Sequence, residues 1–441
     1  MGLKSTLARL AAGAPTPVFA ASGLGAGAQV QDLGLHHQLR FVDTPSAASI
    51  LLVAGGIPDT LAQSLFRLHD TMPHPRCTAW WPLGASAGLW LANFPHHVAI
   101  ESNIPERLGA VHGELVYGQR PSEPPILADE DPAPWRGIGP YGQGGTGMTG
   151  GTPYGRPMAE LGPDRDGLRL DVLPLNIGPF FPRFPAGLTL ELKLAGDVIV
   201  EVGLPVNPFR DSGQRNLRGD GTSPFTRALS EPVLVSELEM ARARAHLRWL
   251  ANALAACELR SLGLRVLRLA KTIGPGEGES LHSLQRVLEW TQALGWSTKG
   301  VGRLGADRLV GLGLGPVARA SGLAEDVRAE DEVYRDLGFE PIVQTGGDAA
   351  ARWRQRLAEA SQSLALAARA GDRLTAPGGV VESPHGRLER TTSPADRLLP
   401  LLPGLLQDME WGDAVTTLVS LDLDLEEATT VEIVGAEAVT R

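Results

Sequence analysis

The chain of 441 residues carries 40 basic and 50 acidic side chains, and its formal net charge of −10 argues against a nucleic-acid partner. Hydrophobic residues make up 43% of the chain and charged residues 20%, as in globular proteins with two or three domains. The two cysteines, Cys77 and Cys257, are too few for a disulfide framework or a cysteine-ligated cluster, and they suit a reducing compartment.

The N-terminal segment is rich in small apolar residues, but Pro15 and Pro17 interrupt it. We therefore do not expect a signal peptide. No apolar segment approaches the roughly 20 residues that a membrane-spanning helix requires. Any association with a membrane is expected to come through partner proteins.

Residues 48–55 (ASILLVAG) form a continuous apolar run, typical of a strand buried on both faces of a parallel sheet. A helix is expected from Ile57-Pro58-Asp59 onward, and a second apolar run, 78–83, follows it. Strand, helix and strand predict a βαβ unit and an open α/β sheet. Ligands of such sheets bind beyond the carboxyl ends of the strands, here Gly55-Gly56 and Gly84-Ala85-Ser86.

The run Asp70-Thr71-Met72-Pro73-His74-Pro75-Arg76 resembles a D-x-M-P-x-P segment of the small complex I subunit that holds the terminal iron–sulfur cluster. The small subunit of nickel–iron hydrogenases is its relative. In this family four cysteines ligate a 4Fe–4S cluster. The resemblance places these four ligand positions at Gly25, Ala28, Ser86 and Asn103.

None of the four positions is a cysteine, and such a cluster needs thiolates, so no iron–sulfur cluster is predicted. Cys77 has two interpretations, a remnant ligand or a buried structural thiol. The second is favoured, because one cysteine cannot hold the cluster.

Residues 117–160 differ in composition, with five prolines followed by a glycine-rich run at 137–151. We predict a linker that joins two parts which are separate chains in the related families. The alternative is a phosphate-binding glycine loop. It is disfavoured because prolines flank the glycines where such a loop needs a strand before it and a helix after it.

Hydrophobic and polar residues alternate along 167–202, which predicts three strands with a loop at 176–182 and a turn at Ala195-Gly196-Asp197. This order resembles the small β-sheet that opens the large, quinone-site subunit of complex I, a relative of the large subunits of nickel–iron hydrogenases. The resemblance places Phe181 where that family carries a histidine that contacts the quinone headgroup.

The same loop is the candidate docking surface, formed by Gly178, Pro179, Phe180, Phe181 and Phe184. Phenylalanines exposed on a proline-rich tip would fit an apolar groove of a partner. The alternative is that they fill the core beneath the loop.

A first long helix is predicted from a capping box of Ser236 and Glu239, with Gly263 just past its end. One face forms a bundle seam, made by Met240, Ala243, Leu247, Leu250, Leu254 and Cys257. Arg242 and His246 share another face four residues apart. They could form a site, but a solvated or interdomain face is the favoured interpretation.

Two further helices are predicted at 280–294 and from an Asp348 N-cap to Gly371. Four segments resemble the large complex I subunit, namely 319–328 (R-x-S-G-x-x-x-D-x-R), the helix with Arg352, Arg356, Glu359 and Ser363, the turn 383–387, and the C-terminal segment 393–422.

Hydrogenases end with D-P-C-x-x-C, and at this place the chain has Asp422, Asp424 and Glu426. Two further cysteines ligate nickel in an earlier segment of hydrogenases, and the corresponding region 207–226 contains no cysteine. A nickel–iron centre is therefore predicted absent. The acidic residues could bind a hard metal ion. However, their alternation with leucines favours the solvated face of a strand, and no metal is predicted.

The resemblance spans about residues 18–430 and implies a fusion of two subunits. The chain is therefore predicted to contain a small-subunit-like α/β domain at 1–116, a linker at 117–160 and a large-subunit-like α+β part at 161–441. Within the last part we expect an antiparallel sheet at 161–205 and a helical bundle at 230–441.

Two functions follow from the resemblance. The first is a peripheral, redox-inactive structural or coupling subunit without cofactors, on the cytoplasmic side of the membrane. It would dock on membrane subunits resembling those of complex I or antiporter-like proteins, and other peripheral subunits are further candidate partners.

The second is a subunit of an NADH-quinone oxidoreductase or hydrogenase-type complex that still binds quinone or another small ligand between its two parts. The site would lie near Ser86 and the loop 25–31. Its polar candidates are His36, His37, His69 and His74.

Overall fold

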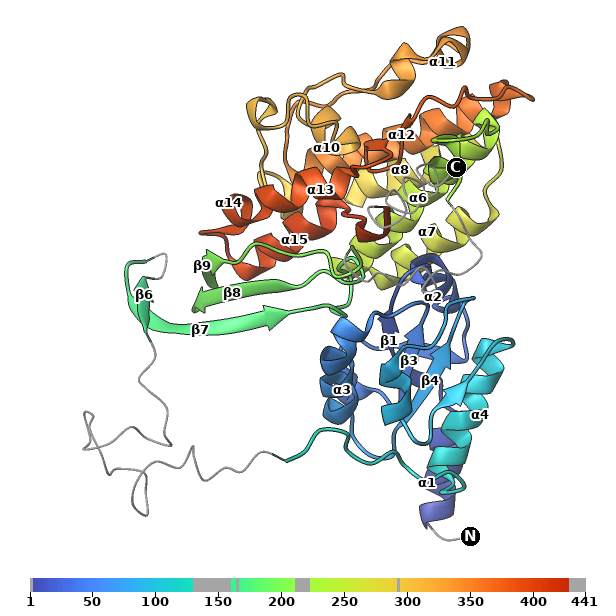
Figure 1. The fold of residues 1–441 in the computed structure, drawn as a ribbon, viewed down its shortest axis with the longest axis vertical. Coiled ribbons are helices and arrows are strands. Elements are labelled where there is room, and N and C mark those ends of the chain that lie inside the picture. The colour runs from blue at the N-terminus through green and yellow to red at the C-terminus, as the bar shows by residue number, and fades with distance from the viewer. Residues whose placement is uncertain (1–2, 130–159, 164–165, 211–222, 292–293, 428–441) are drawn as a thin grey trace.

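The computed structural model describes residues 3–129, 160–163, 166–210, 223–291 and 294–427. Figure 1 shows an N-terminal α/β part joined to a helical bundle, with a small antiparallel sheet beside the bundle. Most of the predicted linker (130–159) and part of the polar stretch (211–222) lie outside the described residues. Within the described residues, no helix is long and apolar enough to cross a membrane.

The N-terminal part is a five-stranded parallel sheet in the order β2-β1-β3-β4-β5. Its strands are β1 (Thr16–Ser22), β2 (Leu39–Phe41), β3 (Ile50–Ala54), β4 (Cys77–Trp81) and β5 (Val98–Ala99). Its helices are α1 (Leu3–Gly13), α2 (Gly27–Leu33), α3 (Ala62–Thr71) and α4 (Ile104–Val116). The predicted βαβ unit is confirmed as β3, α3 and β4.

Strand β3 shows why this sheet needs layers on both sides, because all five of its residues are buried. Leu51 and Val53 belong to the core that continues into the bundle, whereas Ile50 and Leu52 face a second core under α4. A strand buried on both faces is typical of a parallel sheet.

A four-stranded antiparallel sheet follows, in the order β6-β7-β8-β9. Its strands are β6 (Leu161–Pro163), β7 (Arg169–Ile177), β8 (Leu190–Ala195) and β9 (Val198–Val202). The three strands predicted from the alternation are confirmed. Strand β9 joins the bundle through a hydrogen bond from the Ile199 amide to the Met409 carbonyl, 2.9 Å long.

The bundle centres on α6 (Val235–Ala256), which packs against α7 (Arg260–Thr272) and α12 (Ala349–Ala370). The other long helices are α8 (Gly278–Thr291) and α15 (Trp411–Leu421). The shorter elements are α5 (Pro224–Ala228), α9 (Gly295–Thr298), α10 (Gly315–Arg319), α11 (Glu332–Asp336), β10 (Val380–Glu382), β11 (Arg387–Glu389), α13 (Pro394–Leu398) and α14 (Leu402–Leu406). The Asp348 N-cap is confirmed, since its side chain accepts a hydrogen bond from the Ala351 amide.

Two predicted helix boundaries are wrong. Helix α6 begins at Val235 with Leu234 as its N-cap and without a side-chain cap, so Ser236 lies inside the helix and Glu239 contacts Arg328 instead. Gly263 lies inside α7 and does not end a helix. A Cβ atom there would come within 2.7 Å of the Ala251 carbonyl oxygen, so the glycine lets α7 approach α6 closely.

The predicted solvated strand at the C-terminal end is also wrong. Helix α15 ends at Leu421, and Asp422 turns the chain with a left-handed backbone (φ 53°). Leu423 and Leu425 are buried in the main core, Glu427 is buried beside them, and Asp422 and Asp424 are half-buried.

The seam of α6 predicts the cost of truncating a core side chain. Leu254 is fully buried, so Leu254→Ala should lower the free energy of unfolding by about 2–5 kcal/mol. The exposed Leu204 is the matched control, and Leu204→Ala should change it by less than about 0.5 kcal/mol. Urea unfolding of both variants measures this, and equal effects would contradict the assigned seam.

Candidate functional site

The four predicted cluster positions follow the carboxyl ends of the parallel strands. Gly25 comes after β1, Ser86 after β4 and Asn103 after β5, and Ala28 lies in the first turn of α2. Carboxyl ends of parallel strands meet at one edge of a sheet, so the topology brings these loops to the same edge. All four residues are exposed and none has a thiol.

Cys77 does not belong to this edge. It is the first residue of β4, at the opposite, amino edge of the sheet, and it is fully buried. Burial raises the pKa of its thiol to about 12, and nearby Glu123 adds to the shift. The interpretation as a buried structural thiol is therefore confirmed.

The carboxyl edge faces the bundle (Figure 1). The Gly25 amide donates a hydrogen bond of 2.9 Å to Glu426 Oε2. Arg248 of α6 donates to the Ala28 carbonyl at 3.1 Å and to Asp32 at 2.7 Å. These contacts connect the edge to polar groups of the C-terminal part.

A cavity of about 470 Å³ lies beside this contact, between α2, the loop after β7 and helices α6 and α7. Its walls are mostly apolar, with Phe19, Phe41, Phe181 and Leu267 among them. Asp43, which forms ion pairs with Arg183 (3.1 Å) and Arg260, supplies a polar rim.

The candidate docking loop is not an exposed tip. Phe180 is 7% exposed and Phe184 is 9% exposed, and both belong to the main core. Phe181 is partly buried, and its ring centroid lies 4.7 Å from that of Phe184 and 6.2 Å from that of Trp411. The exposed-tip expectation is wrong for Phe180 and Phe184, and the alternative that they fill the core is confirmed. Docking by this loop stays a prediction.

The four histidines named as polar candidates do not gather at the carboxyl edge. His36 and His37 are exposed on the loop that precedes β2, which is the amino side of the sheet. His69 is buried at the end of α3 and contacts Glu123 at 3.0 Å, and His74 contacts Ser122 at 2.6 Å. Glu123 and Ser122 show that the first part of the predicted linker packs on the N-terminal part.

A buried ion network occupies the centre of the bundle. Arg319 contacts Glu359 at 2.7 Å, Asp326 at 2.9 Å and Glu382 at 2.7 Å. Arg328 continues the network to Asp326 at 2.8 Å and to Glu239 at 3.1 Å. Several of these residues lie in segments that resemble complex I, but their spacing in the sequence does not predict that they meet.

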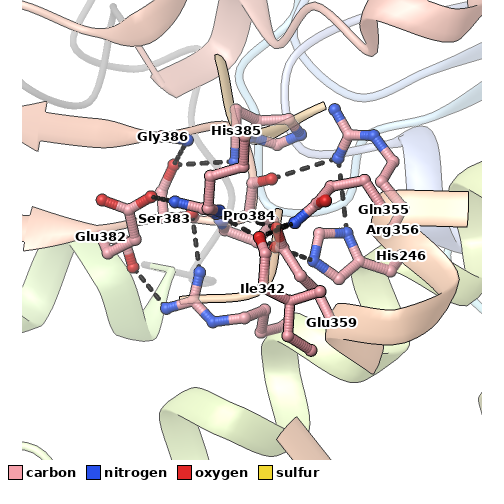
Figure 2. A network of polar contacts seen from close by, with 12 residues as sticks. His246, Ile342, Gln355, Arg356, Glu359, Glu382, Ser383, Pro384, His385 and Gly386 are labelled. Atoms are coloured by element: carbon pink, nitrogen blue, oxygen red, sulfur yellow. Dashed lines mark hydrogen bonds and ion pairs between the residues drawn. The ribbon is translucent and has the colours of Figure 1, made fainter. Parts of the chain in front are cut away.

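The network also holds the turn that carries His385 (Figure 2). Arg242 donates to the carbonyls of Glu382 and Ser383 at 2.6 and 2.7 Å, and Arg356 donates to that of Pro384 at 3.1 Å. The prediction of a solvated or interdomain face is therefore wrong, since Arg242 and His246 are each 1% exposed and their partners lie within the bundle.

The pKa values of several groups in the network are shifted by burial and by these ion pairs. Burial alone would raise the pKa of Glu359, but Arg319 and His246 hold it well below its ordinary value. Burial lowers the pKa of His246 to about 4, despite Glu359. Burial and the neighbouring Asp326 raise the pKa of Glu382 to about 7.

A second polar cluster lies at the C-terminal end of the described chain. His385 Nε2 is 3.4 Å from Asp422 Oδ2, and its Nδ1 is 3.0 Å from Glu427 Oε1 and 3.8 Å from Asp424 Oδ2. Burial raises the pKa of Asp424 to about 6, with Glu427 adding to the shift. Within the described residues, His385, Asp424 and Glu427 are the group whose atoms could hold a metal ion.

The comparisons with known proteins fall on the helical part. Residues 277–410 match the family described as "Respiratory-chain NADH dehydrogenase, 49 Kd subunit". This part of the chain therefore contains a region similar to the 49 kDa subunit of complex I, and it includes Arg319, Glu359, Glu382 and His385.

Individual relatives agree with this family. The chain is 38% identical over 89 residues to a subunit of the NADH-quinone oxidoreductase of Rhizobium etli, covering 20% of this chain and 22% of the relative. It is 44% identical over 70 residues to a subunit of the F(420)H(2) dehydrogenase of Methanosarcina mazei, covering 15% and 19%. A third relative is a subunit of the NAD(P)H-quinone oxidoreductase of Prochlorococcus marinus, 37% identical over 101 residues, covering 22% and 25%. The chain thus spans about a fifth to a quarter of the length of these relatives.

The depressed pKa of His246 predicts a pH dependence of stability. The unfolded chain protonates this imidazole below its ordinary pKa of 6.5, whereas the folded chain does so only near 4, so its contribution to stability is lost as the pH falls through this window. Against His246→Gln, which cannot titrate there, the parent should lose about 1.6 kcal/mol between about pH 6.5 and 5, with a slope that approaches about 1.4 kcal/mol per pH unit as the pH falls. Urea unfolding at several pH values measures the difference, and a constant difference would contradict a neutral buried imidazole.

Proposed function

We propose that the chain is a peripheral, redox-inactive structural or coupling subunit of a complex I-like assembly. The observation that carries the proposal is the thiol-free edge of the N-terminal sheet, where Gly25, Ala28, Ser86 and Asn103 occupy the positions assigned to cluster ligands. Iron–sulfur clusters are held by thiolates, or in some centres by histidines, and none of these four side chains supplies either. Gly25 and Ala28 instead form hydrogen bonds with side chains of the C-terminal part.

The proposal includes a fusion of two subunits, with a small-subunit-like part at 1–116, a linker at 117–160 and a large-subunit-like part at 161–441. The similarity of 277–410 to the 49 kDa family supports the second part. The parallel sheet with its carboxyl edge against the bundle supports the first. No nickel–iron centre is included, because the residues at the C-terminal ligand positions are carboxylates rather than thiolates.

The relatives are named as subunits of quinone oxidoreductases and of an F420H2 dehydrogenase, which supports an assembly with partner subunits. We place the chain on the cytoplasmic side of a membrane, docked on subunits resembling those of complex I or on antiporter-like proteins. The surface around the loop 178–184 is the proposed contact. Its buried phenylalanines would stiffen the loop from below and would not enter the partner.

The cavity beside the sheet edge favours a second candidate function, the binding of quinone or another small apolar ligand. Its volume of about 470 Å³ falls in the range of ligand pockets, about 300–1,000 Å³. Phe181 lines this cavity, so the residue at the position of the quinone-contacting histidine gives an apolar wall without a hydrogen-bond donor. Quinone in an organic extract of the purified protein would favour this second function.

The assignment of the four ligand positions can be tested by placing cysteines there. The parent chain, incubated anaerobically with iron and sulfide, should remain colourless because it lacks the four thiolates. The quadruple variant Gly25→Cys, Ala28→Cys, Ser86→Cys and Asn103→Cys should take up about four irons and absorb near about 400 nm. Iron analysis and absorption spectra of the two proteins measure this.

A cluster in the parent would contradict the redox-inactive function. A folded quadruple variant that binds no iron would instead contradict the assignment of the four positions. Circular dichroism of both proteins controls for folding.

A further inference from the structure

We propose that His385, Asp424 and Glu427 form a binding site for a divalent transition-metal ion of the Mn²⁺ or Zn²⁺ class. The site lies between the bundle and the carboxyl edge of the N-terminal sheet. It is independent of the proposed function, which concerns thiolate-bound cofactors.

The geometry suits one ion. One ligand atom from each of the three residues lies within 4.8 Å of the others. Two ligands about 2.1 Å from the same ion are at most about 4.2 Å apart, so a small closure completes the site. Asp422, 3.4 Å from His385, offers a further carboxylate, although Arg356 already contacts it at 3.0 Å.

The nitrogen of His385 is an independent sign of a ligand. Its Nδ1 is buried and lies 3.0 Å from Glu427 Oε1 and 3.8 Å from Asp424 Oδ2, but it forms no hydrogen bond with either oxygen or with another described residue. Buried polar atoms are rarely left without such a partner. A bound cation at this nitrogen would account for the missing hydrogen bond.

Neighbouring groups orient the carboxylates as outer-shell partners of metal ligands do. Ser383 donates to Glu427 Oε2 at 3.2 Å, which leaves Oε1 facing His385. Asp424 Oδ1 accepts from the amides of Glu426 and Glu427 at 2.7 and 3.2 Å, which leaves Oδ2 toward the site. Glu427 is 8% exposed, so the position of its carboxylate is fixed by packing.

The local charge favours a cation. Among the ion pairs of the described residues, His385 is the one cationic partner of Asp424 and of Glu427. A divalent ion would displace the imidazole proton and balance both carboxylates. Two cavities of about 350 and 360 Å³ border His385 and Asp424, and they give water and ions access.

The ligand chemistry selects the class of ion. A site with one imidazole and two or three carboxylates, without thiolate, suits Mn²⁺ or Zn²⁺. Ca²⁺ prefers oxygen ligands throughout, and Fe–S or Ni-thiolate chemistry needs cysteines that these positions lack.

The full chain, stripped with a chelator, would be titrated with Mn²⁺ and followed by electron paramagnetic resonance, with Zn²⁺ and Ca²⁺ as competitors. We expect one saturable Mn²⁺ site that Zn²⁺ displaces and Ca²⁺ does not. Asp424→Asn and Glu427→Gln should each lower the affinity for Mn²⁺ by about 100-fold. Loss of an outer-shell partner typically lowers metal affinity by about 10–100-fold, and loss of a direct ligand should cost at least as much. Mn²⁺ should also raise the melting temperature of the parent and not that of these variants.

Glu426→Gln is the matched control, because it removes the same charge from the same segment while its carboxylate faces the Gly25 amide. It should weaken Mn²⁺ binding by less than about threefold, or about 0.7 kcal/mol. Absence of Mn²⁺ and Zn²⁺ binding in the parent would overturn the proposal. Equal losses in Glu426→Gln and Glu427→Gln would also overturn it, since they would indicate general attraction to acidic residues.

Discussion

The arrangement of the C-terminal part depends on the buried guanidinium of Arg319. It joins α12 through Glu359, the segment before Arg328 through Asp326, and β10 through Glu382. Removing one partner of a buried ion pair leaves an uncompensated charge and costs about 3–5 kcal/mol. The helices and the short hairpin around Arg319 are therefore fixed relative to one another.

This constraint reaches the interface between the two parts of the molecule. The turn after Glu382 is held by Arg242 and Arg356, and it presents His385 toward the C-terminal acidic segment. Glu426 belongs to the same acidic segment, and its carboxylate accepts a hydrogen bond from the Gly25 amide on the edge of the N-terminal sheet. A continuous series of polar contacts thus runs from the centre of the bundle to the carboxyl edge of the N-terminal sheet, and the proposed metal site lies along it.

The sequence predicted those elements that have a regular pattern. The alternation of 188–202, the apolar run of β3 and the Asp348 N-cap all appear as expected, because each depends on local periodicity or on one side chain. Strand β1 was not predicted, since Pro17 and the small residues around it are unusual in a central strand.

The ion network could not be predicted, because a charged residue on a helix looks the same in sequence whether water or a distant residue is its partner. Arg319 and Glu382, for example, are 63 positions apart. The C-terminal acidic residues were assigned to a strand for a related reason. Their alternation with leucines fits a strand, but burial of Leu423 and Leu425 in the bundle core determines the fold there.

The chain, whose residues Gly25, Ala28, Ser86 and Asn103 supply no thiolate, is proposed to work as part of a membrane assembly. The most direct measurement is affinity capture of the tagged full chain from detergent-solubilised native membranes, with mass spectrometry of the subunits and their stoichiometry. A coupling subunit should be recovered with polytopic subunits that resemble those of complex I or antiporters, in a fixed ratio to the chain. A chain recovered alone, or with soluble enzymes and no membrane subunit, would contradict it.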